Sequence, residues 1–415
     1  MIPFSTFTLD NGLQVLVHED PTVQIAVMNI LYDVGSRDEQ PDKTGFAHLF
    51  EHLMFGGSLN IPNYDEPLQQ VGGENNAFTN TDITNYYLTV PAANLETGFW
   101  LESDRMLSLS FDPTVLEVQR KVVVEEFKQR YLNQPYGDVW LKIRPLAYKV
   151  HPYQWATIGK EIKHIENATM NDVRDFFFTH YIPNNAILAV AGNVTHEQVR
   201  ILSEKWFGPI PSGIKKSRNL VNEPLQTEKR SLTVQAKVPA HALYKSYHMQ
   251  GRFSNDFYAA ELLSDILSRG QSSRLYNQLV KERKIFTTIS SFTMGSIDPG
   301  MFVISGRLSP GITPEAGEEE LEKLIQGLLK EGLRAGELQK VKNQSLTAME
   351  FEKVEVINRA MNLAFAALSG DANLINHESQ LIEAFEEDDI LNSGARILTE
   401  ENSSVIYYHA EGLDA

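Results

Sequence analysis

Two histidines and a glutamate in one short segment, His48-Leu49-Phe50-Glu51-His52, are the residues best suited to chemistry. On a helix, residues four positions apart lie one above the other, so both imidazoles can reach one metal ion, and Glu51 shares their face. A zinc ion held by two neutral imidazoles can activate water, and a neighbouring carboxylate can accept the proton. The spacing H-x-x-E-H therefore indicates zinc-dependent hydrolysis. A pair of structural histidines is the alternative interpretation.

A short helix over residues 44–55 is predicted to carry this motif. Gly45 precedes the motif and Gly56-Gly57 follows it, and glycines of this kind commonly bound a short helix. The chain contains no cysteine, so disulfides and thiolate ligands are excluded. Any metal site must therefore use histidine and carboxylate ligands.

A third ligand is needed if zinc is to keep one position for water. A long helix is predicted after Asp112-Pro113, where a capping side chain precedes a helix-compatible proline. Its core-facing stripe consists of Leu116, Gln119, Val123 and Glu126. A carboxylate on such a stripe needs a partner, which favours Glu126 as the ligand. Glu125 points roughly 100° away and remains the less favoured candidate.

Further elements of the N-terminal half are predicted from their residue patterns. Residues 4–17, with a turn at Asp10-Asn11-Gly12, and residues 24–34 are expected to form a hairpin of strands. Other elements of this half are a helix over 64–71, strand residues 76–90 with a turn near 80–82, a helix over 169–179 and a strand over 186–192.

The expected fold is α+β, with two similar α/β-sandwich halves, each a largely antiparallel sheet flanked by helices. Residues 1–207 form the first domain, and residues 208–229 are a linker rich in proline, glycine and charge. Residues 230–415 form the second domain. Its predicted elements are strands over 230–238 and 242–249, helices over 254–268 and 273–284, strands within 286–307, two helices, and a final strand over 403–409.

The formal charge of −17 argues against nucleic acid or anionic membranes as partners, because such surfaces repel an acidic protein. No stretch of the chain has the length and apolarity of a membrane span. The N-terminal residues lack the basic and apolar regions of a secretion signal. We therefore expect a cytoplasmic protein, or a periplasmic one if a signal has been removed.

The sequence resembles the M16 peptidases, the family of pitrilysin, insulin-degrading enzyme and mitochondrial processing peptidase. The resemblance is carried by LDNGLQVLVHED, VGSRDEQPDKTGFAHLFEHLMFGGS, VGGENNAFTNTDITNYYLTV, RKVVVEEF, HPYQWATIGKEIKHI, HYIPNNAILAVAGNV and SSRLYNQLVKERK. It implies that His48, His52 and Glu126 bind Zn²⁺ and that Glu51 is the general base. It also implies a peptide-binding edge strand that contains Asn76, Ala77 and Phe78.

Three positions depart from the family pattern. Gln119 replaces a usual glutamate beside the metal site. Val280 and Thr287 stand where complete members have an Arg and a Tyr that hold the substrate and its oxyanion.

The resemblance therefore implies a zinc endopeptidase for peptides or small unfolded proteins. A homologous partner subunit in a heterodimer would supply the Arg and Tyr and help enclose a chamber, and a homodimer is the other possible assembly. The alternative is a catalytically silent subunit with a structural or peptide-binding role.

Overall fold

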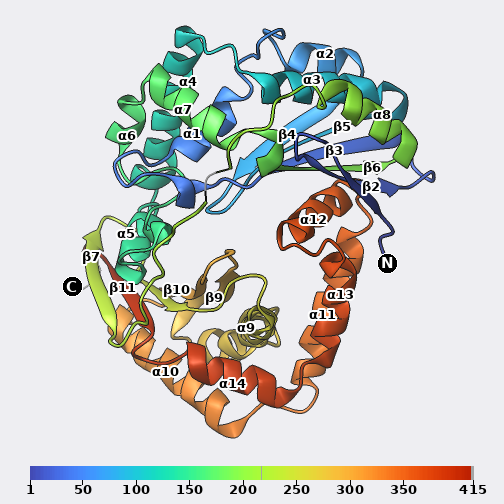
Figure 1. Ribbon diagram of the computed structural model, residues 1–415. Coiled ribbons are helices and arrows are strands. Elements are labelled where there is room, and N and C mark those ends of the chain that lie inside the picture. Colours follow the sequence, from blue (N-terminus) through green and yellow to red (C-terminus); the bar gives the residue numbers. More distant parts are fainter. Residues whose placement is uncertain (216, 413–415) are drawn as a thin grey trace. The chain divides into compact units, whose positions relative to one another are not determined.

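The chain folds into two compact units, which the computed structural model describes over residues 1–215 and 217–412 (Figure 1). Among these residues, unit 1 consists of Met1–Lys128, Trp155–Leu220 and Glu350–His377. Unit 2 consists of Gln129–Gln154, Val221–Met349 and the described residues from Glu378 onward. The division predicted from sequence is contiguous, whereas each unit of the structure is built from three separate stretches.

Unit 1 is built on a six-stranded sheet in the order β1-β2-β6-β3-β5-β4. β2 and β6 are parallel, and every other neighbouring pair is antiparallel. The strands are β1 Ser5–Thr8, β2 Gln14–Glu19, β3 Ile25–Tyr32, β4 Glu74–Thr79, β5 Thr84–Pro91 and β6 Ala186–Gly192. The sequence predicted that the opening residues pair with residues 24–34 in a hairpin. This pairing was wrong, because β6 lies between β2 and β3. The opening residues instead form their own hairpin, β1–β2.

Helices cover both faces of this sheet. They are α1 Phe46–Leu53, α2 Asp65–Gln70, α3 Leu95–Leu107, α4 Pro113–Phe127, α6 Ile162–Glu166, α7 Met170–His180, α8 His196–Trp206 and α12 Val356–Leu368. α3 packs against β3 and β5 through Gly98, where an added Cβ would lie 2.7 Å from Met28 Sδ of β3 and 3.0 Å from Leu88 Cδ1 of β5. α12 packs on the other face of the sheet (Figure 1), and its Leu363 shares a buried cluster with Val27 and Leu31 of β3. Late residues of the chain therefore complete the core of unit 1.

Unit 2 repeats the sheet topology of unit 1. Its strands are β7 Arg230–Ala236, β8 Ala242–His248, β9 Phe286–Met294, β10 Met301–Leu308 and β11 Ser403–Ala410. Their order is β7-β11-β8-β10-β9, with β7 and β11 parallel and the other pairs antiparallel. This is the same permutation as β2-β6-β3-β5-β4. The predicted fold class of two similar halves is confirmed.

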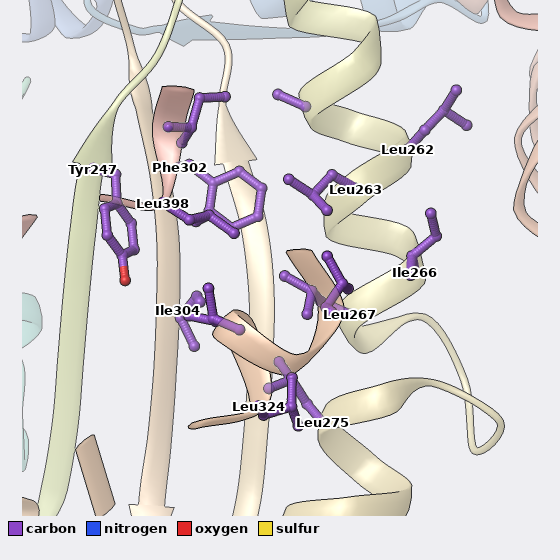
Figure 2. Close-up of a cluster of buried hydrophobic side chains, with 14 of the residues drawn as sticks. Tyr247, Leu262, Leu263, Ile266, Leu267, Leu275, Phe302, Ile304, Leu324 and Leu398 are labelled. Carbon is purple, nitrogen blue, oxygen red and sulfur yellow. The ribbon is translucent and has the colours of Figure 1, made fainter. Parts of the chain in front are cut away.

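The core of unit 2 lies between its sheet and α9 Asn255–Ser268. Figure 2 shows Leu263 and Leu267 of α9 facing Phe302 and Ile304 of β10. Helical segments of this unit also include α5 Val139–Ala147 and the π-helical stretch η6 Tyr276–Glu282. Two helices were expected between β10 and β11, and this was wrong. The structure has five, namely α10 Pro314–Glu331, α11 Glu337–Glu352, α12, α13 Leu374–Ala384 and α14 Glu387–Ile397.

No helix in the described part of the chain is both long enough and apolar enough to cross a membrane.

Candidate metal centre

α1 presents His48 and His52 on the face opposite its buried side. Phe46, Leu49, Phe50 and Leu53 of this helix are 5% exposed or less and fix it in the core. The two histidines are partly exposed, at 13% and 24%, and their ring centroids lie 4.9 Å apart. The helix thus brings two imidazoles together, as their spacing of four predicts.

Glu126 of α4 joins the two histidines. Its Oε2 atom lies 3.7 Å from His48 Nε2 and 3.5 Å from His52 Nε2. α4 starts at the predicted place, because the Asp112 side chain accepts a hydrogen bond from Thr114 N at 2.7 Å. One ligand atom from each residue lies within 4.8 Å of the other two. Two helices far apart in sequence therefore place three possible ligands at one point.

The neighbouring Glu125 points elsewhere. Its side chain is 60% exposed and pairs with Lys128 at 2.6 Å. Val123 and Phe127, by contrast, are 0% and 4% exposed, so the helix turns its other side into the core. The structure thus brings Glu126, and not Glu125, to the histidines.

The three side chains suit a catalytic zinc ion by donor type and by separation. Two imidazole nitrogens and one carboxylate oxygen form a usual ligand set for a zinc site that keeps its fourth position open. Zinc bond lengths near 2.05 Å in a tetrahedron place ligand atoms about 3.4 Å apart. The separations of 3.5 and 3.7 Å from Glu126 are close to this value.

Glu51 lies on the same helix, between the two histidines in sequence. Burial raises the pKa of its carboxyl group, and the negative charge of Glu126 acts in the same direction. Hydrogen bonding by Thr79 and the proximity of His52 oppose the rise. A carboxyl group with a raised pKa can both accept and return a proton near neutral pH.

β4 forms one edge of the unit 1 sheet, as predicted for the segment with Asn76, Ala77 and Phe78. Ala77 lies opposite Tyr86 in the antiparallel ladder with β5. The other side of β4 has no strand partner among the described residues. α1 packs against this strand, so the candidate metal centre and a free sheet edge are neighbours.

A buried ion pair beside these elements was missed by sequence reasoning. Arg105 is 1% exposed, and its Nε and Nη2 atoms donate to Glu102 at 2.8 and 2.6 Å. Its guanidinium lies 4.4 Å from the ring of Tyr86 and 4.6 Å from that of Tyr64. The only signal in the sequence is a pair of opposite charges three residues apart, which is also common on exposed helix surfaces.

Glu39 was missed as well. It is 7% exposed, and its carboxylate accepts hydrogen bonds from Gly45 N and Ala47 N at 2.9 Å each. A glutamate six residues ahead of the N-cap of a helix has no recognised capping pattern, so the sequence offered no usable signal.

The two residues of the second domain that depart from the family pattern, Val280 and Thr287, both lie in unit 2. Val280 is partly buried against the core of that unit. Thr287 is exposed near the start of β9, and its hydroxyl donates to Arg307 O at 3.2 Å. Neither side chain carries a positive charge or a phenol.

Comparison with known families gives two matches along the chain. Residues 14–144 match the family described as insulinase (peptidase family M16). Residues 167–345 match the family described as the peptidase M16 inactive domain. The two matches cover both the ligand helices and most of unit 2.

Individual proteins agree with these matches. The zinc protease PqqE of Helicobacter pylori is 32% identical over 341 residues, which cover 81% of this chain and 77% of that protein. The beta subunit of the mitochondrial-processing peptidase of Saccharomyces cerevisiae is 29% identical over 209 residues, or 50% of this chain and 45% of that one.

The crystal structure of a protease from Helicobacter pylori superposes with a TM-score of 0.94 at 28% identity, covering 99% of this chain and 100% of that one. Sequence, fold and the convergence of histidine and glutamate side chains thus agree, and the chain belongs to peptidase family M16, a family of zinc metallopeptidases.

Proposed function

We propose that this protein is a zinc-dependent endopeptidase in which His48, His52 and Glu126 hold the ion and Glu51 is the general base. The observation that carries the proposal is the convergence of these three ligand atoms within 4.8 Å, with Glu51 on the same helix as the two histidines. Similar proteins that are named zinc proteases support it.

The reaction is hydrolysis of a peptide bond. A bound zinc ion would supply Lewis acidity at this site. Glu51 accepts a proton from the attacking water and returns it to the departing amine. Burial, which raises the pKa of Glu51, brings this carboxyl group closer to the range in which both transfers are easy.

The substrate is an extended peptide that adds to the edge of the sheet. The backbone of β4 at Asn76, Ala77 and Phe78 offers hydrogen bonds on its unpaired side. Backbone pairing of this kind requires an unfolded segment and imposes little sequence preference. We therefore propose peptides and small unfolded proteins as substrates.

A related partner subunit completes the site. The side chain of Val280 has no donor group, and the hydroxyl of Thr287 is uncharged and donates to Arg307 O, so neither residue replaces the Arg or the Tyr. One oxyanion contact is worth about 3–4 kcal/mol in the transition state. A second copy of this chain would lack the same groups. We propose a heterodimer in which a homologous chain supplies the Arg and the Tyr and encloses the substrate in a chamber. A similar protein that is by name a peptidase subunit supports this arrangement.

The test combines metal analysis with activity. The purified chain should bind one zinc ion and cleave unfolded peptides slowly by itself. A homologous chain with Arg and Tyr at the positions of Val280 and Thr287 should raise the rate by at least about 100-fold, as one oxyanion contact commonly does. His52→Ala should abolish both zinc binding and the stimulated activity.

Two results would contradict parts of this proposal. High activity of the chain in the absence of any partner would exclude the need for a heterodimer. A chain that binds peptide but no zinc would instead be a silent, peptide-holding subunit.

A further inference from the structure

Glu39 links the turn of the β4–β5 hairpin to the first turn of α1. Its two carboxylate oxygens accept one backbone N–H each, Oε2 from Gly45 and Oε1 from Ala47. Gly45 is the N-cap of α1 and has no side chain that could accept these bonds. Glu39 therefore satisfies N–H groups that a helix would otherwise leave unpaired, and a carboxylate is favoured there by the helix dipole.

The capped turn carries the first of the two histidines. Ala47 immediately precedes His48, so the N–H group held by Glu39 is one residue from a proposed ligand. Thr44, which is fully buried, holds the chain just ahead of the helix, since its Oγ1 accepts a hydrogen bond from Lys160 N at 2.7 Å. The first turn of α1 is thus fixed from outside the helix.

The other end of this link is the hairpin turn that follows β4. Glu39 directly follows a short 3₁₀ turn, η1 Ser36–Asp38. Ser36 N donates to Asn80 O at 3.2 Å, and Arg37 N donates to Thr81 O at 2.9 Å. Asn80 is the first residue beyond β4, the free edge strand. Backbone hydrogen bonds therefore attach the turn η1, which Glu39 directly follows, to the hairpin turn at the end of the edge strand.

Gly35 permits this attachment. A Cβ atom at this position would lie 2.4 Å from Asp82 N and 2.5 Å from Thr81 C, closer than any side chain could approach a backbone. The turn η1 can therefore lie directly on the hairpin only because residue 35 is glycine. The contact is backbone to backbone, so it is stiff.

We propose that Glu39 is a positioning residue that sets the place of His48 relative to the edge strand. The inference rests on the proposed function, because it assumes that His48 binds zinc and that β4 binds peptide. Glu39 touches neither the ion nor the substrate. It acts through the backbone of Gly45 and Ala47.

The test uses Glu39→Gln in the full chain, with Glu337→Gln as a matched control. Gln keeps the length of the side chain but replaces one acceptor oxygen with a donor group. Glu337 is equally buried, at 7%, and accepts from Arg274 and from Arg334 N, but it lies in unit 2. Zinc affinity is measured by chelator competition. Hydrogen exchange of the amides of residues 45–48 is measured with and without zinc.

Glu39→Gln should raise the zinc dissociation constant by about 10- to 100-fold, as loss of a residue that orients a ligand commonly does. Exchange at residues 45–48 should accelerate in the metal-free protein. Glu337→Gln should leave both measurements unchanged. If Glu39→Gln does not fold, Glu39→Asp serves instead, because it keeps the charge and is too short to reach both amides, and it should weaken zinc binding as well.

Zinc affinity within about two-fold of the unaltered protein, together with unchanged exchange at residues 45–48, would overturn the inference. A purely structural role would lower the unfolding midpoint and leave the zinc affinity of the folded protein unchanged. An unaltered protein that binds no zinc contradicts the proposed function instead. The exchange comparison then still decides whether Glu39 orders the first turn of α1.

Discussion

The Oε2 atom of Glu126 lies 3.5 Å from the Nε2 atom of His52, although the two residues belong to different helices, α4 and α1. The adjacent residue on α4, Glu125, is directed toward Lys128 and is mostly exposed. Two neighbouring carboxylates of the same type thus occupy opposite environments, and each serves as a control for the other.

Glu126→Gln should abolish tight zinc binding, because an amide is a poor zinc ligand and only two histidines would remain. We expect the dissociation constant to rise by more than about 100-fold, beyond the usual effect of changing an outer partner. Glu125→Gln should change it little. Equilibrium dialysis with zinc distinguishes the two variants, and equal losses would refute the assignment of Glu126.

Arg105→Met should destabilise unit 1 strongly. The change leaves Glu102 buried without its cation, and breaking a buried pair in this way costs about 3–5 kcal/mol. Arg200→Met is the control, because Arg200 is 39% exposed and its pairs with Glu197 and Glu204 are worth about 0–1 kcal/mol. Urea unfolding measures both free energies. Similar values for the two variants would show that the Arg105 pair is not structurally important.

Glu261 of α9 should make the stability of unit 2 depend on pH. Burial raises its pKa to about 7, with Asp265 and Glu378 acting in the same direction and Arg252 opposing them. The ordinary pKa of this carboxyl group is near 4.5. At a pH between that value and about 7, Glu261 keeps its proton in the folded chain and has lost it in the unfolded chain. Raising the pH through this window therefore lowers the free energy of unfolding, by an amount on the order of 3 kcal/mol.

The comparison that isolates this effect is urea unfolding of Glu261→Gln at pH 5 and pH 8. The variant should be more stable than the unaltered protein at pH 8 and similar to it at pH 5. Glu331→Gln, an exposed position in α10, controls for loss of a carboxylate. A Glu261→Gln variant with no advantage at pH 8 would contradict the expectation.

Leu363→Ala should destabilise unit 1 even though the residue comes late in the chain. Leu363 is fully buried against Val27 and Leu31 of β3, and truncating such a side chain costs about 2–5 kcal/mol. Asn362→Ala, an exposed neighbour on α12, should have little effect. The effect is measured by hydrogen exchange of the backbone amides of β3 and β6. If Leu363→Ala leaves the protection of these amides unchanged, the packing of α12 on this sheet is contradicted.

Local patterns were sufficient for the elements of the candidate site. Both ends of α1 followed from glycines, and the start of α4 followed from Asp112-Pro113, because these residues act on the nearest turn of the helix. Helical periodicity placed Glu126 on the inner stripe of α4 and Glu125 on the outer one. The strand at residues 186–192 was bounded by its apolar run and coincides with β6.

Features that depend on distant contacts were not predicted. The place of β6 between β2 and β3 is set by pairing across the whole of unit 1, for example between Gln14 and Ile187. The spacing of apolar residues along α12 also could not show that this helix belongs to unit 1. An apolar helix face does not identify the surface against which it packs. Glu39 and Arg105 share a further difficulty, since burial of a charged side chain is decided by its partners and leaves no mark in the local sequence.

The strand order of unit 1 also has a consequence for how the protein forms during synthesis. β6 is the last of its strands to be made, yet it must insert beside β2 and β3, and α12 is made later still. Until then β2 and β3 present unpaired edges and an uncovered apolar face. Such non-local pairing slows folding and exposes intermediates to aggregation. Unit 1 therefore cannot finish folding until α12, Val356–Leu368, has been translated, long after its first five strands.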